Sequence, residues 1–158
     1  MTLTLSTATW THQRQGRYVL VDGSGYERGT YERSGRSMRQ ATATIEGVPI
    51  NLTGRGVLNR TLVASDSGGQ QVAQIEVSGL SWGGRVTLSG AGPQPISRRI
   101  GLPVTFTVGD PDSPLLVMGM HHRRAEMTFL AQLPQHHPAL LPLMLLLMQH
   151  HANSGSQL

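Results

Sequence analysis

Apolar and polar residues alternate along most of the chain, in short runs that end at turn residues. In one run, Ala73, Ile75 and Val77 alternate with a mainly polar set. Such period-two alternation places one set of side chains on one face of a β-sheet. The pattern predicts twelve strands, over Leu3–Trp10, Arg17–Asp22, Tyr26–Glu32, Met38–Ile45, Val48–Thr53, Val57–Ala64, Gln71–Ser78, Arg85–Ser89, Gln94–Arg99, Val104–Val108, Leu115–Met120 and Arg124–Leu133. The last run also suits a helical period, and we assign it as a strand.

A repeat of four strands accounts for this number of runs. Asp22, Asp66 and Asp110 are 44 residues apart, each in a segment rich in turn residues, with an apolar run before it and a strand-like run after it. An Asp side chain accepts backbone hydrogen bonds within a turn, and Gly supplies positive φ angles there. We therefore predict three units of four strands, each with an Asp turn in the same place. The alternative is that the equal spacing of common turn residues is chance.

The C-terminal part has a different pattern. Residues 138–148 are apolar without a polar stripe, and Leu and Met favour a helix. The segment predicts a helix over about Ala139–His151, about 20 Å long at 1.5 Å per residue. That is shorter than the roughly 20 apolar residues that span a bilayer, so we predict no transmembrane segment. A helix that is apolar on every side must be enclosed on every side, and only the β-rich part of the chain can enclose it.

Composition narrows the class of protein. The length of 158 residues suits a single domain over residues 1–158, and the charged fraction of 14% argues against disorder. The absence of cysteine excludes disulfides, zinc–thiolate sites and a cysteine nucleophile. The start, Met1–Leu5, shows no secretory signal, so we expect a cytoplasmic location. The net charge is +4, and all thirteen basic residues are arginine, which pairs well with phosphate and carboxylate.

A predicted sheet of about twelve strands with one apolar helix resembles the tubby-like fold, which is shared by the tubby C-terminal domain, the LURP-one-related proteins and the phospholipid scramblases. The resemblance is carried by the strand–turn–strand pattern of residues 63–75, its echo at residues 108–117 and the late apolar segment of residues 139–148. It covers nearly the whole chain as a pattern. It implies a closed antiparallel barrel around a core helix. It also implies a non-enzymatic domain, peripheral to the membrane, that binds anionic phospholipid headgroups.

The candidate binding residues are four arginines within twelve residues: Arg28, Arg33, Arg36 and Arg39. If their side chains converge, they can clamp lipid phosphates. Glu27 and Glu32 dilute the cluster, and the competing interpretation is a solvated, salt-bridged face. The alternative function is a protein-interaction or structural module with no lipid ligand. We expect no nucleic-acid partner, no cofactor and no metal.

A third possibility is a small serine hydrolase that uses Ser81. Residues 79–83 match the pattern G-x-S-x-G, and Asp110 or Asp112 and then His121, His122 or His136 follow in the order of a hydrolase triad. That pattern requires a turn from a strand into a helix, whereas a second strand is predicted here. Three histidine pairs, at 121–122, 136–137 and 150–151, are interpreted as polar groups at the mouths of the barrel. The two Asp residues around Pro111 are interpreted as a turn.

Overall fold

The architecture is mainly β with one C-terminal helix. The structure is a computed structural model that describes residues 7–14, 16–34, 39–121, 124–129 and 138–155. Within these residues the strands are β1 (Thr7–Arg14), β2 (Arg17–Asp22), β3 (Glu27–Arg33), β4 (Gln40–Ile45), β5 (Val48–Arg55), β6 (Asn59–Ser65), β7 (Gln71–Ser78), β8 (Gly84–Leu88), β9 (Gln94–Arg99), β10 (Val104–Asp110), β11 (Ser113–His121) and β12 (Arg124–Phe129). The helix is α1 (Leu140–Gly155). The predictions of a mainly β chain and of a late apolar helix are confirmed.

The strands follow one another around the helix in sequence order. Each strand pairs with its neighbours in the chain in an antiparallel direction, and β1 pairs with both β2 and β12, so that the order of neighbours returns to its start as a barrel. Trp10 on β1, for example, lies opposite Leu20 on β2 and Ala125 on β12. Three predicted strands have the predicted bounds (β2, β7 and β9), and the others differ at one or both ends.

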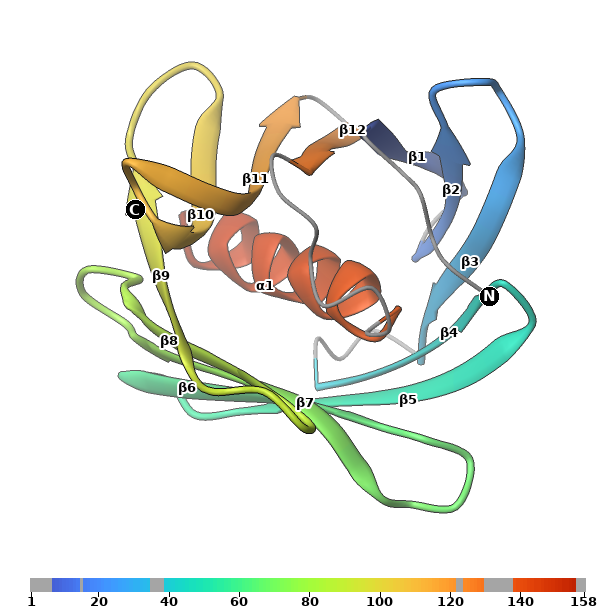
Figure 1. Cartoon of the computed structure of the whole chain (residues 1–158), viewed down its shortest axis with the longest axis horizontal. Helices are drawn as coiled ribbons and strands as arrows, with labels where there is room; N and C mark the ends of the chain where they lie inside the picture. The colour runs from blue at the N-terminus through green and yellow to red at the C-terminus, as the bar shows by residue number, and fades with distance from the viewer. Residues whose placement is uncertain (1–6, 15, 35–38, 122–123, 130–137, 156–158) are drawn as a thin grey trace.

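Helix α1 lies inside the ring of strands (Figure 1). Every residue from Ala139 to Gln149 is buried, so the helix exposes no face over this length. The barrel wall holds it by hydrogen bonds near the two ends of its buried length. The indole nitrogen of Trp10 donates to the carbonyl oxygen of Leu141 over 3.2 Å, and the hydroxyl of Tyr31 donates to Oε1 of Gln149 over 2.7 Å. The buried polar atoms of Trp10, Tyr31 and Gln149 therefore have partners, as burial requires.

The predicted repeat is present in the structure. Asp22, Asp66 and Asp110 begin the turns after β2, β6 and β10, at intervals of four strands. In each turn the carboxylate oxygen Oδ1 accepts a hydrogen bond from the backbone N–H two residues ahead, over 2.9 Å at Ser24, 3.0 Å at Gly68 and 2.9 Å at Asp112. The three Asp turns thus mark three units of four strands.

Enclosure of the helix makes a direct prediction at Leu145, whose side chain is buried near the middle of α1. We expect Leu145→Asp to prevent folding to the native state, because an unpaired charge would lie in an apolar interior. Leu145→Met conserves volume and should cost less than about 1.5 kcal/mol of unfolding free energy. Both are checked by chemical denaturation of the purified proteins. A cooperatively folded Leu145→Asp variant would contradict the enclosed-helix architecture.

Candidate functional site

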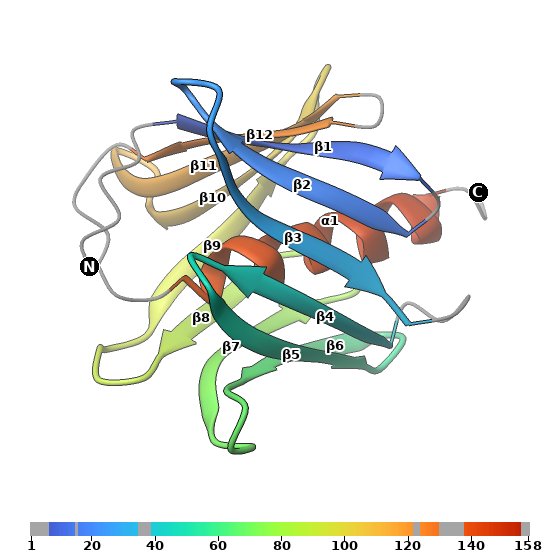
Figure 2. The ribbon, with the colours of Figure 1, turned by 90° about the vertical axis from the view of Figure 1, so that its right-hand side faces the viewer.

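The two ends of the barrel carry opposite charges. The connections β1–β2, β3–β4, β5–β6, β7–β8 and β9–β10 lie at one end, because neighbouring strands are antiparallel. Figure 2 shows the C-terminal end of helix α1 on the same side of the barrel as the ends of β1 and β3. We call this the arginine end. Its described arginine side chains are those of Arg14, Arg17, Arg33, Arg39, Arg55, Arg60, Arg85, Arg98 and Arg99.

Acidic residues gather at the opposite end. The turns there carry Asp22, Glu27, Glu46, Asp66, Asp110 and Asp112. Among the arginines whose side chains are described, Arg28 alone lies with them. At the arginine end, Glu32 lies 3.6 Å from both Arg14 and Arg17, and Glu76 lies 3.3 Å from Arg85. Among the side chains that the structure describes, the two acids near the arginine end are therefore already paired, and nine arginines outnumber them.

The four arginines predicted to form one site are not brought together. Arg28 and Arg33 are five positions apart on β3, about 16 Å along a strand, and odd spacing turns them to opposite faces. Arg28 donates to Asp22 over 2.6 Å and to Glu46 over 3.0 Å. The hydrogen bond from Arg28, together with those from the backbone N–H groups of Tyr26 and Ser24, lowers the pKa of Asp22. Arg28 therefore belongs to an ion-pair network at the acidic end and does not form one cluster with Arg33, contrary to the prediction.

The other three members lie elsewhere or outside the described residues. Arg33 ends β3 at the arginine end and is half-buried. Arg39 is exposed at the same end, and its backbone carbonyl accepts a hydrogen bond from Gly54 over 2.8 Å. Arg36 falls outside the residues that the structure describes. Arg33 and Arg39 thus lie at the arginine end without Arg28, and a binding role for these residues stays a prediction.

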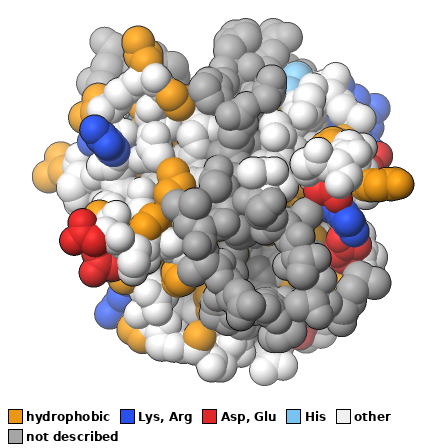
Figure 3. All heavy atoms as spheres, turned by 45° about the horizontal axis from the view of Figure 1, so that its top comes forward, with side chains coloured by type: hydrophobic (Ala, Val, Ile, Leu, Met, Phe, Trp, Pro, Cys, Tyr) orange, Lys and Arg blue, Asp and Glu red, His pale blue; other side chains and the backbone are white. Residues whose placement is uncertain are grey.

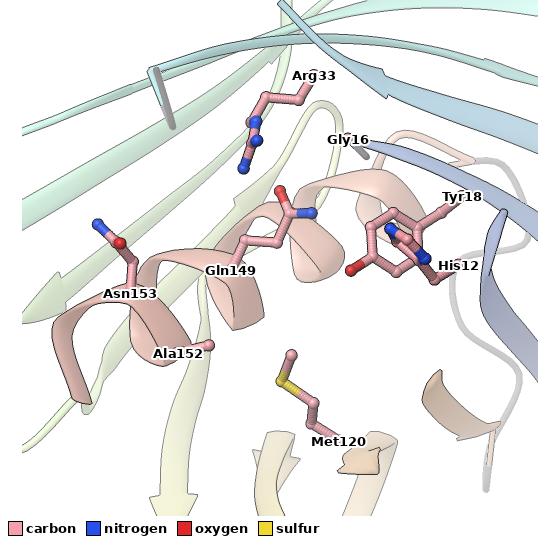
Figure 4. A pocket seen from close by; sticks show the side chains of 8 residues that line it. All are labelled: His12, Gly16, Tyr18, Arg33, Met120, Gln149, Ala152 and Asn153. Atoms are coloured by element: carbon pink, nitrogen blue, oxygen red, sulfur yellow. The ribbon is translucent and has the colours of Figure 1, made fainter. Parts of the chain in front are cut away.

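Arg33 borders an open pocket of about 360 Å³ beside the end of the helix. Figure 4 shows the Arg33 guanidinium extending toward Gln149, with Tyr18 and His12 on the neighbouring wall and Asn153 on the helix. The His12 and Tyr18 rings pack edge to face, with their centroids 5.2 Å apart. The lining thus combines four polar side chains and one guanidinium with the apolar side chains of Met120 and Ala152.

A second group of residues surrounds the last turns of the helix. The guanidinium carbon of Arg60 lies 4.2 Å from the ring centroid of Trp82, which is a cation–π contact. The Trp82 ring also packs against His151, with centroids 5.0 Å apart, and Nη1 of Arg98 lies 3.1 Å from Nε2 of His151. Arginine can only donate, so Nε2 of His151 accepts and the imidazole is neutral. Burial and the nearby Arg98 and Arg60 lower the pKa of His151.

This second group has no local signal in the sequence. Arg60, Trp82, Arg98 and His151 come from four elements that are far apart in the chain, and the antiparallel order of the barrel brings their ends to one rim. The one signal for a basic rim is the position of the arginines along the strands. Nearly every arginine falls near the end of an odd-numbered strand or the start of an even-numbered one.

The remaining candidates are placed in turns or outside the described chain. Ser81 lies in the β7–β8 turn, where its Oγ accepts a hydrogen bond from the N–H of Gly83 over 3.2 Å, and a strand follows rather than a helix. His136 and His137 lie outside the described residues, as does His122, and His150 lies against Gly54. No group of three or more His, Cys, Asp or Glu side chains is close enough to hold a metal within the described part of the chain.

Comparison with known proteins identifies the fold alone. No family model matches the chain, and no curated protein does. The X-ray structure of a protein from Arabidopsis thaliana is similar, with a TM-score of 0.55 at 9% sequence identity over 90% of each chain. At this identity the likeness concerns the architecture and carries no function. Of the helical structure described here, none is long and apolar enough to cross a membrane.

The environment of His151 predicts how its imidazole titrates. We expect its pKa to lie below 6.5 in the folded protein and to rise in Arg98→Gln, since that change removes a neighbouring positive charge. As the pH falls, the unfolded chain then protonates His151 at a higher pH than the folded protein does. The His151 contribution should therefore lower the free energy of unfolding as the pH falls below about 6.5. Imidazole chemical shifts measured by NMR over pH 4–8 test this. An unshifted pKa in both proteins would refute it.

Proposed function

We propose that this chain is a non-enzymatic, tubby-like binding domain that recognises anionic phospholipid headgroups at a membrane surface, using the arginine end of the barrel. The observation that carries the proposal is the separation of charge between the two ends. Nine described arginines gather at one end, whereas the described acids there are two and are already paired. The likeness to the Arabidopsis structure supports the barrel fold of the proposal and not its ligand.

Charge separation of this kind orients a protein at a charged surface. An anionic leaflet attracts each nearby Arg by about 1 kcal/mol and repels the acidic end, so the barrel approaches with its arginine end first. The attraction decays within a Debye length, which is about 8 Å at physiological ionic strength. Binding therefore needs the arginines to be gathered at one end, and a uniform distribution of the same net charge of +4 would be far less effective.

The chemistry of arginine suits phosphate. Its planar guanidinium presents paired N–H donors that match two phosphate oxygens, and it keeps its charge at every physiological pH. Arg39, Arg55 and Arg99 are exposed to solvent at this end. Arg60 and Arg98 are half-buried near the end of α1, where they add positive potential over the mouth of the barrel.

The test is co-sedimentation with vesicles of neutral lipid, or of neutral lipid with phosphatidylserine or phosphoinositide. We expect binding to the anionic vesicles that weakens as salt is raised. The triple variant Arg39→Gln, Arg55→Gln and Arg99→Gln should bind roughly a hundredfold more weakly, at about 1 kcal/mol for each arginine.

A control with the same change in net charge separates position from total charge. Ser24→Glu, Ser67→Glu and Gln70→Glu add three negative charges at exposed sites of the acidic end, and this variant should keep most of its binding. Equal losses in the two variants would show that only net charge matters. An absence of binding to every vesicle would reject the lipid proposal in favour of a protein-interaction or structural module.

A further inference from the structure

Large hydrophobic side chains are exposed on three loops of the arginine end. The exposed fractions are 75% at Val57, 74% at Leu58, 85% at Leu80 and 77% at Ile100, and Leu102 is fully exposed. The sequence pattern had placed Val57 and Leu58 within a strand. In the structure β5 ends at Arg55 and β6 begins at Asn59, so both side chains project from the loop between them. Within the described residues, the acidic end exposes Tyr26 and Val48 in this way.

These loops are neighbours along the rim of the barrel. They connect β5 to β6, β7 to β8 and β9 to β10, and these six strands are adjacent in the sheet. The first two loops touch, because the N–H of Gly79 donates to the carbonyl oxygen of Leu58. A side chain at Gly79 would overlap that carbonyl, so glycine is required for the approach. The tips of the first two loops are thus fixed to each other through a backbone contact.

Arginines flank each of the three tips. Arg55 and Arg60 stand before and after the first loop, Arg85 follows the second, and Arg99 directly precedes Ile100. Residues 56–58, 79–83 and 100–103 contain no Asp or Glu, and the described acid closest along these strands, Glu76, is paired with Arg85. On the face that Figure 3 presents, hydrophobic side chains lie near basic side chains at the upper left, and acidic side chains lie lower on the same side. An anionic membrane interface accommodates apolar loop tips that are flanked by basic side chains. We call the flanking arginines Arg55, Arg60, Arg85 and Arg99 the basic collar.

We propose that these three loops enter the interfacial layer of an anionic membrane, with the side chains of Leu58, Leu80 and Leu102 inserted among the lipid chains and the flanking arginines at the level of the phosphates. This inference rests on the proposed function and adds the mode of binding. Electrostatic attraction brings the arginine end to the surface, and burial of the apolar tips then holds it there. The barrel stands with its acidic end away from the membrane.

The shape of the surface favours a membrane over a protein partner. The apolar side chains occupy three protruding tips rather than the floor of a groove, and a fluid interface closes around separate tips without a complementary surface. The collar also repels basic partners and needs an anionic one. A folded acidic protein that fits three tips is the alternative outcome of the experiment below.

The chain contains no cysteine, so a single cysteine can be introduced and labelled at a chosen position. We would label Leu80→Cys and Leu102→Cys separately with an environment-sensitive fluorophore, and use Ser67→Cys in the acidic-end turn as the matched control. On addition of phosphatidylserine-containing vesicles, the two loop labels should shift to the blue and be quenched by lipid-borne quenchers in the acyl region. The label at position 67 should not respond.

A second variant measures the contribution of the tips to affinity. Leu80→Ser with Leu102→Ser leaves every arginine in place and should weaken vesicle binding by about tenfold to a hundredfold. The residual binding of this variant should be more sensitive to salt than that of the parent protein. The control Tyr26→Ser removes an exposed apolar side chain from the acidic end and should leave binding unchanged.

The outcomes separate the inference from the function on which it rests. Vesicle binding with no response of the loop labels, or with a response at position 67, would overturn loop insertion and leave electrostatic lipid binding intact. Full binding by the double serine variant would also overturn insertion. Failure to bind any vesicle would reject both, and saturable binding of an acidic protein at the loop labels would then assign the surface to that partner.

Discussion

The structure depends on the burial of one helix that has no polar face. All eleven residues from Ala139 to Gln149 are buried, so this segment can fold only inside something that surrounds it. The strands enclose the helix by turning alternate side chains inward. Because the antiparallel strands form a ring, every strand contributes to this enclosure. The inward residues are mainly aliphatic, as an aromatic content of 4% requires, while Trp10 and Tyr31 use their polar atoms to hold the helix at its two ends.

Enclosure of the helix also connects the fold to the charge pattern. The C-terminal end of a helix carries partial negative charge, which favours cations nearby. Here Arg60 and Arg98 surround the last turns of α1 through Trp82 and His151. Stabilisation of the helix end is therefore sufficient to explain why Arg60 and Arg98 lie at that rim. It does not account for exposed arginines such as Arg55 and Arg99, nor for the apolar loop tips between them, and these are the features that the proposed lipid function uses.

Much of the fold could be predicted because its signals are local. Alternation is visible within a single strand, the helix is an unbroken apolar segment, and Asp22, Asp66 and Asp110 each make hydrogen bonds within four residues. The site could not be predicted in the same way. Closeness in sequence suggested that Arg28 and Arg33 act together, yet a strand separates its two ends by many ångströms, and Asp22 and Glu46 neutralise Arg28. Arg60 and Arg98 meet near His151 only because the barrel order brings their strand ends to one rim. Val57 and Leu58 read as strand residues because apolar character alone does not distinguish an exposed loop from a core position.

The most direct test of this account is hydrogen–deuterium exchange measured by mass spectrometry, with and without phosphatidylserine-containing vesicles. In both conditions the amides of residues 144–149 should be among the slowest to exchange, because they open only when the barrel unfolds. Vesicles should slow exchange in the loops around residues 56–58, 79–83 and 100–103 and leave the turns at 66–70 and 110–113 unchanged. Rapid exchange along the helix would contradict its enclosure. Protection at the acidic turns instead of the three loops would contradict the proposed orientation of the barrel at a membrane.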